Sequence, residues 1–179
     1  MNTASLLDPT SPAAERLQAP QAWAIRRASC SDVPEVKRLF LKLHAFNAAL
    51  DPRFALSEAW EPRFEAAIER ALCGDEAMCL LAYEASTGRP CGFALAAVHR
   101  DSDMWRYREW VEVEALYVEN AWHGCGLADA LVTQTSAWAN SQGQTVVQLY
   151  VTASNERAIR FYRHEGFQTT QAIMRKIIA

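Results

Sequence analysis

The sequence predicts a single α/β (α+β) domain with a mixed β-sheet flanked by helices, and three observations support this fold class. The 179 residues suffice for one buried core and are too few to argue for two. Short apolar runs suited to strands are interspersed with longer segments of three- and four-residue apolar spacing, which is typical of amphipathic helices. The strand–helix–strand order over residues 110–151 implies a parallel strand pair, whereas the turn-rich residues 86–90 imply an antiparallel hairpin.

The N-terminal region differs in composition from the rest of the chain. Residues 1–22 contain Pro9, Pro12 and Pro20 among small polar residues, without a sustained apolar period. Such composition is typical of a flexible leader. The domain itself is therefore expected over residues 23–179, beginning with a strand near Trp23.

Two helices are expected after this first strand. The tetrapeptide at 32–35, Asp-Val-Pro-Glu, combines a capping Asp, an early Pro and a Glu three residues after the cap, which is typical of a helix start. Apolar residues follow at helical spacing as far as Phe46, and Asp51-Pro52 ends the pattern. A second helix is expected over residues 57–72, ended by Gly74.

The remaining elements complete the predicted order β-α-α-β-β-β-α-β-α-β. Apolar runs predict the strands, and helical spacing between turn residues predicts the helices. The expected elements are strands at 78–83, 91–98 and 110–118, a helix at 126–142, a strand at 146–151, a helix at 155–165 and a final strand at 167–178.

Composition limits the possible functions. Half of the residues are hydrophobic and the formal net charge is −3, which argues against a nucleic-acid-binding protein because such proteins usually carry a basic excess. No apolar run approaches the ~18 residues of a membrane span, and the N-terminus lacks the pattern of a signal peptide. The five scattered cysteines lack metal-ligand or disulfide spacing. We therefore expect a cytoplasmic protein with no nucleic-acid or membrane partner.

The most informative segment follows the strand that ends in Leu116-Tyr117-Val118. Two glycines, Gly124 and Gly126, precede a helix there. A diphosphate requires several converging backbone N–H groups, which the free amides of a helix start provide, and glycine lets the backbone approach closely. On spacing alone, the glycines are also compatible with a simple tight turn.

Here the sequence resembles the GNAT superfamily of acetyl-CoA-dependent N-acetyltransferases, in which Arg or Gln, two residues, Gly, one residue, and Gly or Ala follow such a strand. This chain has His123-x-x-Gly126-x-Ala128. His123 departs from the family pattern, so a guanidinium contact is lost while backbone contacts to the diphosphate should remain. The cofactor-binding residues implied by this resemblance are Leu116, Tyr117, Val118, His123, Gly124, Cys125, Gly126, Leu127 and Ala128.

A second motif of the same superfamily lies downstream. It consists of Asn, two residues, Ala, an aromatic pair and a later Gly-Phe, and residues 155–167 contain every element. The resemblance adds Asn155, Ala158 and Tyr162 to the cofactor-binding residues. By propensity, Asn155 also caps the helix, and Tyr162 lies one turn beyond Ala158 on the same helical face. Together the two motifs extend the resemblance over residues 110–168.

The resemblance implies transfer of an acetyl group from acetyl-CoA to an amine by direct attack, without a metal. Relatives use a Glu at the position of Glu114 as base or water holder, and a Tyr at the position of Tyr162 as general acid. The two-residue period of a strand places Glu112 and Glu114 on one face, so either carboxylate, or a water between them, remains a candidate base. The oxyanion would be held by a strand amide near Leu116 or Tyr117.

Acceptor specificity is expected from the first two helices and from the loop at 100–109. Asp51 and Glu112 offer carboxylates for a cationic amine, and Trp105 and Tyr107 offer aromatic surfaces. An aminoglycoside or polyamine is our first expectation for the acceptor. A protein amino group, and a regulatory module that binds acetyl-CoA without catalysis, are the alternatives. The resemblance leaves a monomer and a homodimer open.

Overall fold

The protein is described from a computed structural model over residues 22–178. The predicted leader lies outside these residues, apart from its last position. The strands and α-helices are β1 (Trp23–Arg27), α1 (Val33–Leu50), α2 (Trp60–Cys73), β2 (Ala77–Glu84), β3 (Pro90–Arg100), β4 (Glu109–Val118), α3 (Leu127–Ser141), β5 (Val147–Leu149) and α4 (Glu156–His164). Short 3₁₀ turns η2 (Pro52–Phe54) and η3 (Asn120–Trp122) follow α1 and β4.

The five strands form one mixed sheet in the order β1-β2-β3-β4-β5. The first four pair antiparallel, and β4 and β5 pair in parallel. The hairpin of β2 and β3 and the parallel pair were predicted from the sequence. The parallel pairing joins only Val111–Val113 to Val147–Leu149. Because β5 ends at Leu149, the last part of β4 is paired only on its β3 side.

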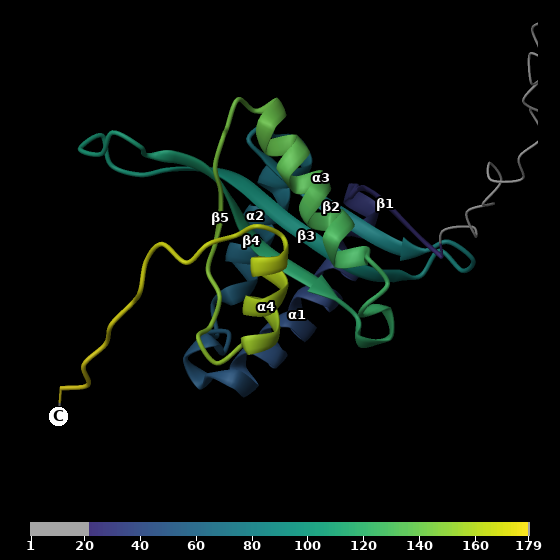
Figure 1. Cartoon of the computed structure of the whole chain (residues 1–179). Coiled ribbons are helices and arrows are strands. Elements are labelled where there is room, and N and C mark those ends of the chain that lie inside the picture. Colours follow the sequence, from purple (N-terminus) through teal and green to yellow (C-terminus); the bar gives the residue numbers. More distant parts are fainter. Residues whose placement is uncertain (1–21, 179) are drawn as a thin grey trace, which may run out of the picture.

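Helices cover both faces of the sheet (Figure 1). On one face, α1 and α2 pack Leu39, Phe64 and Ile68 against inward residues of β2 and β3. On the other face, α3 contributes Leu127 and Leu131. Two apolar clusters therefore hold the sheet between helical layers, as expected for a domain of packed secondary-structure layers.

Strand β4 contains a β-bulge at Glu114. Leu95 and Ala96 are consecutive in β3, but their partners in β4 are Ala115 and Val113, so Glu114 is an extra residue in the ladder. Such a bulge bends the strand and redirects side chains. The bulge directly follows Val113, the last residue of β4 that pairs with β5.

The predicted final strand at 167–178 is wrong. The chain has no strand after β5 among the described residues, and four large apolar side chains of this segment are 71–95% exposed. The sequence has the β-branched content of a strand, but a strand forms only where another strand offers hydrogen bonds. In this structure the segment runs without such a partner. The observed order therefore ends in a helix, β-α-α-β-β-β-α-β-α, with α2 beginning three residues later than expected.

Within residues 22–178, none of the helices combines the length and apolarity required to cross a bilayer.

Candidate active site

The turn between β4 and α3 adopts a conformation that requires its glycines. Gly124 and Gly126 have φ angles of +78° and +80°, and a Cβ added at either position would meet no atom within 4 Å. The left-handed conformation therefore explains glycine at these positions, and the open space beside them leaves the backbone accessible.

Helix α3 begins with free amides. Its N-cap is Gly126, which has no side chain to cap the helix, and the amide of Ala130 bonds back to the Gly126 carbonyl at 3.0 Å. The amides of Leu127, Ala128 and Asp129 precede that first helical bond and point out of the helix end. Together with the helix dipole, they form a site suited to the diphosphate of a carrier such as coenzyme A.

His123 turns toward the strand rather than standing free in the turn. Its Nε2 lies 2.8 Å from the carbonyl oxygen of Val118, so the imidazole links the turn to the end of β4. Two further contacts stabilise the turn: Trp23 Nε1 donates to the Cys125 carbonyl at 3.4 Å, and Cys125 Sγ donates to the Trp122 carbonyl at 3.0 Å. His123 and Cys125 therefore act on the shape of the turn through hydrogen bonds.

Helix α4 carries the second predicted group of residues. The side chain of Asn155 accepts from the Ala158 amide at 3.1 Å and caps the helix, as predicted. Tyr162 packs between Phe161 and Phe167, with ring centroids 5.1 and 5.6 Å away. Burial raises the pKa of the Tyr162 phenol to about 12, so the group stays protonated at neutral pH.

The bulge places Glu114 opposite helix α2. The Glu114 carboxylate accepts a hydrogen bond from Arg70 Nη2 at 2.7 Å, and its side chain is 29% exposed. Burial raises the pKa of Glu114, while the Arg70 guanidinium and its hydrogen bond act in the opposite direction. A carboxylate with a raised pKa, held beside a cation, has the character of a proton-accepting group.

Glu112 lies beside a second basic side chain. His99 on β3 is opposite Trp110 on β4, and their rings stack with centroids 4.5 Å apart. Glu112 accepts from Trp110 Nε1 at 3.4 Å and lies 4.0 Å from His99 Nδ1. The negative charge of Glu112 also contributes to raising the pKa of Glu114.

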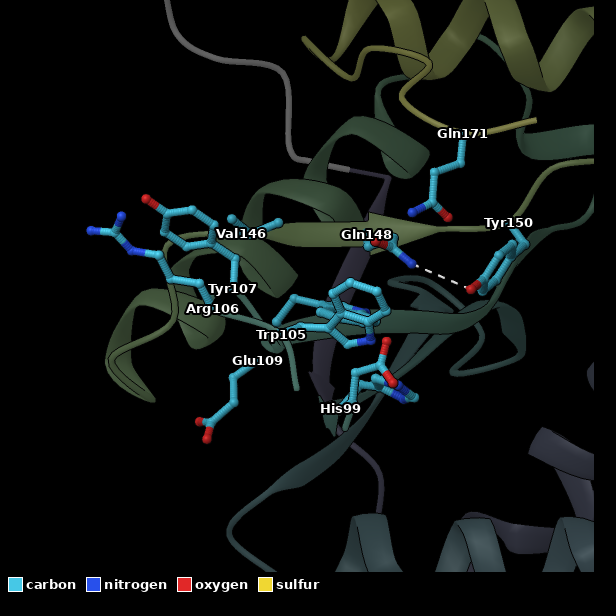
Figure 2. A pocket seen from close by; sticks show the side chains of 11 residues that line it. His99, Trp105, Arg106, Tyr107, Glu109, Val146, Gln148, Tyr150 and Gln171 are labelled. Atoms are coloured by element: carbon cyan, nitrogen blue, oxygen red, sulfur yellow. Dashed lines mark hydrogen bonds between the residues drawn. The ribbon is translucent and has the colours of Figure 1, made fainter. Parts of the chain in front are cut away.

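A hollow of about 730 Å³ lies at the β5 side of the sheet. Figure 2 shows Trp105 near its centre, between His99 and the Gln148–Tyr150 pair, with Gln171 on the opposite side. Tyr107 also lines the hollow. The two aromatic residues predicted for acceptor binding are thus in one cavity, and Glu112 is connected to it through Trp110.

Asp51 lies apart from this hollow. Its carboxylate accepts from the Arg53 side chain and backbone within η2, and these bonds lower the pKa of Asp51 to about 2. The hollow is lined by other residues. The structure therefore brings Trp105, Tyr107 and Glu112 together and leaves Asp51 outside the group.

Among the described residues, one set of metal-type ligands lies together. Asp129, His164 and Glu165 offer ligand atoms within 4.8 Å of one another. Burial and a hydrogen bond with Asp129 raise the pKa of Glu165. The set joins the start of α3 to the end of α4.

Sequence reasoning missed two residues of the site. Arg70 is 44 residues from its partner Glu114, and no local pattern marks an ion pair at that separation. No local pattern marks His99 either, because only the pairing of β3 with β4 brings it next to Trp110 and Glu112.

Comparison with known proteins agrees with the motifs. The sequence model described as "Acetyltransferase (GNAT) family" matches residues 43–167. Among curated relatives, an uncharacterised N-acetyltransferase of Methanocaldococcus jannaschii is 29% identical over 86 residues, covering 48% of this chain and 38% of the relative. One from Mycobacterium bovis is 37% identical over 81 residues, covering 45% and 47%. The matched regions thus span less than half of these relatives.

Solved structures share the fold. A mutant of a Bacillus halodurans protein superposes with a TM-score of 0.74 at 19% identity, covering 87% of this chain and 99% of that chain. An aminoglycoside antibiotic 6'-N-acetyltransferase from Acinetobacter haemolyticus gives 0.66 at 20% identity, covering 87% and 98%. An aminoglycoside N-acetyltransferase in complex with coenzyme A gives 0.66 at 18% identity, covering 87% and 94%. With the family match spanning most of the chain, the two motifs and this fold lead to one conclusion: the chain belongs to the GNAT acetyltransferase family.

Proposed function

We propose that this protein transfers the acetyl group of acetyl-CoA to an amine. The observation that carries the proposal is the row of free amides at Leu127, Ala128 and Asp129, at the start of α3 and beyond the positive-φ glycines. Strand β4 ends at this turn, and its last residues are no longer paired with β5, which is compatible with an extended pantetheine arm lying along this part of β4. Family membership supports the same cosubstrate.

The proposed chemistry is a direct transfer. The amine nitrogen attacks the thioester carbonyl carbon, forming the amide bond, and the carbon–sulfur bond breaks. An alkyl amine with a pKa near ~10.4 is neutral only about once in 2,500 molecules at pH 7, so a proton acceptor is needed. Glu114, directly or through a water, takes the proton that the amine loses. The raised pKa of its carboxyl and its location in the bulge support this role.

Two further groups complete the reaction. A backbone amide near Leu116 or Tyr117, on the part of β4 that β5 no longer pairs, stabilises the oxyanion. Tyr162 gives its phenolic proton to the departing sulfur. A phenol is protonated at neutral pH, and burial raises the pKa of this one further. Each step uses side chains or backbone of this chain, and none requires a metal ion.

For the acceptor, we propose a small cationic amine of the aminoglycoside or polyamine type. Trp105 and Tyr107 provide aromatic faces in the hollow, and Glu112 lies next to its Trp110 wall. Aromatic faces and a carboxylate together suit a cationic group. Two of the fold neighbours are aminoglycoside N-acetyltransferases, which supports testing that class first. We also propose a cytoplasmic location, where the exposed thiols of Cys30, Cys73 and Cys125 would stay reduced.

The proposal is tested by measuring thiol release from acetyl-CoA with a panel of amines, alongside calorimetry of coenzyme A binding. We expect coenzyme A to bind without any acceptor, and thiol release to rise with at least one aminoglycoside or polyamine. Binding without release for every small amine and for peptides with free amino groups would favour a regulatory module. Release with peptides alone would favour a protein acceptor. Failure to bind coenzyme A would contradict the proposal itself.

A further inference from the structure

Glu119 directly follows β4 and begins the turn that leads to α3. Its amide donates to the Cys91 carbonyl at 2.8 Å, and its carbonyl accepts from the Trp122 amide at 2.8 Å, which closes η3. Glu119 is the N-cap residue of η3, but its carboxylate points to α1 instead of capping the turn. The side chain is only 16% exposed. A charged group that is this well covered requires partners.

Two basic side chains of α1 provide these partners. Arg38 Nη1 and Lys42 Nζ each donate to Glu119 Oε1 at 2.7 Å. They are four residues apart and therefore lie on one face of the helix. Burial acts to raise the pKa of Glu119, but the bonds from Lys42 and Arg38 outweigh it and hold that pKa below its ordinary value. The carboxylate is thus ionised at neutral pH, and we call the three residues the clasp.

Arg38 extends the clasp to a neighbouring strand. Its Nη2 donates to the Pro90 carbonyl at 3.1 Å, at the start of β3, and its Nε donates to Glu35 at 2.7 Å on its own helix. The planar guanidinium is therefore held in one orientation. Helix α1 passes the end of β4 here (Figure 1). Arg38 thus connects α1 to the start of β3 and to the end of β4.

The later part of the turn is weakly restrained by packing. Gly124 and Gly126 both have positive φ, and the space beside them is open. Glycine has more backbone freedom than any other residue. The direction of the first amides of α3 therefore depends on how the ends of the turn are anchored, and Glu119 provides a charged anchor at its start.

We propose that Glu119 is a positioning residue for coenzyme A, which acts by fixing the start of the turn and thereby the direction of the α3 amides. This inference rests on the proposed function, since it assigns a role in binding the cosubstrate. Arg38 and Lys42 act through Glu119, so the helix layer on which acceptor binding is expected also helps to shape the cosubstrate site. Residues that act on a binding site without touching the ligand usually change its affinity by roughly 2- to 30-fold.

The first test is calorimetry of coenzyme A binding to the full chain. Glu119→Gln keeps the size of the side chain and removes its charge, and it should weaken binding by about fivefold or more. Arg38→Met should also weaken binding, and the double variant should bind about as weakly as Glu119→Gln alone, because the two residues act as a unit. Glu61→Gln is the matched control, since Glu61 on α2 also pairs with a lysine of α1, Lys37, and should bind as the wild type does.

The outcomes of this test distinguish the two proposals. Coenzyme A binding by the wild type with unchanged affinity in Glu119→Gln would overturn the inference and leave the proposed function intact. Additive losses in the double variant would also overturn it, because independent effects exclude a clasp. A wild-type chain that binds no coenzyme A would contradict the proposed function and this inference with it.

The second test separates positioning from a general loss of stability. Ile68→Val removes a buried methylene from the cluster beneath α1 and α2, so it should lower the Tm without changing coenzyme A affinity. In Glu119→Gln without ligand, hydrogen exchange followed by mass spectrometry should become faster over residues 119–130 and stay at the wild-type rate over α2. Unchanged exchange in the turn, or an equal loss of affinity in Ile68→Val, would show that Glu119 contributes only to stability and would overturn the inference.

Discussion

Glu114 in the bulge of β4 and Arg70 on α2 form an ion pair with an oxygen–nitrogen distance of 2.7 Å. The pair connects the helix layer to the strand that carries the candidate base. Burial and Arg70 act on the pKa of Glu114 in opposite directions, so the pair sets the pH range in which the carboxylate can accept a proton.

We predict that Arg70→Met moves the acidic limb of the pH–rate profile to higher pH. Removing the cation leaves burial unopposed, the pKa of Glu114 rises, and less of the carboxylate is ionised at a given pH. Arg70 is half exposed, and such pairs contribute about 0.2–1 kcal/mol, so we expect a movement of roughly 0.7 pH unit or less. Arg63→Met, another exposed arginine of α2, is the control. Identical pH–rate profiles for both variants and wild type would show that Arg70 does not affect the pKa of the catalytic base.

We predict that Glu114→Gln lowers turnover by about 10²–10⁴, the usual contribution of a general base. Coenzyme A affinity, measured by calorimetry, should stay near that of wild type. Glu112→Gln is the matched control, two residues away on the same strand. A larger loss of turnover in the control than in Glu114→Gln would assign the base to Glu112.

Glu114→Gln, which should lower turnover, is not expected to lower the stability of the protein. Because the folded state raises the pKa of Glu114, the folded protein binds this proton more tightly than the unfolded chain does. Stability from this group is therefore lost as pH rises through the interval between the ordinary and the raised pKa. Above that interval the ionised carboxylate disfavours folding, so Glu114→Gln should have an equal or higher Tm at pH 7. A marked fall in Tm would show that the Arg70 pair outweighs burial.

Tyr162→Phe tests the proposed acid. The phenyl ring can keep the packing against Phe161 and Phe167, so the Tm and coenzyme A affinity should change little. Turnover should fall by roughly 10²-fold or more, because no phenolic proton is available for the leaving sulfur. Phe161→Leu serves as a control for packing without removal of a hydroxyl. Wild-type turnover in Tyr162→Phe would exclude the phenol from the reaction.

Gly126→Ala should weaken coenzyme A binding by about tenfold or more. A Cβ at φ +80° costs roughly 1–2 kcal/mol, and relief of that strain would rotate the first amides of α3. Gly88→Ala is a matched control, since Gly88 has φ +70° and equally open surroundings in the turn between β2 and β3. Both variants should lose similar stability in urea, and only Gly126→Ala should lose affinity. Equal affinities in the two variants would contradict the amide site.

Much of the fold could be predicted because local patterns agree with the tertiary structure. The Asn155 cap, the paired glycines before α3 and the strand–helix–strand order each depend on neighbouring residues. The final strand could not be predicted correctly from β-branched composition, because a strand also requires a partner edge. β5 is paired on one side only, yet residues 167–178 do not pair with it, and the composition of the segment carries no information on that pairing.

In the candidate site, too, the residues of contiguous motifs could be predicted, and those brought together by tertiary packing could not. The turn at 123–128 and the α4 residues follow from contiguous motifs. Arg70 and His99 reach Glu114 and Glu112 only through helix packing and strand register, which no local spacing reveals. Asp51 was expected to offer a free carboxylate to the acceptor. In the structure, that carboxylate accepts a hydrogen bond from the Arg53 amide within its own turn.

The bulge in β4 places the candidate base at a position that the pairing of the sheet does not require. Val113 and Ala115 keep regular partners on either side of Glu114, so the ladder is continuous without the extra residue. A chain lacking Glu114 altogether could restore an uninterrupted antiparallel pair with both apolar clusters intact. Such a deletion would yield an inert scaffold of the same shape, in which binding could be studied free of turnover.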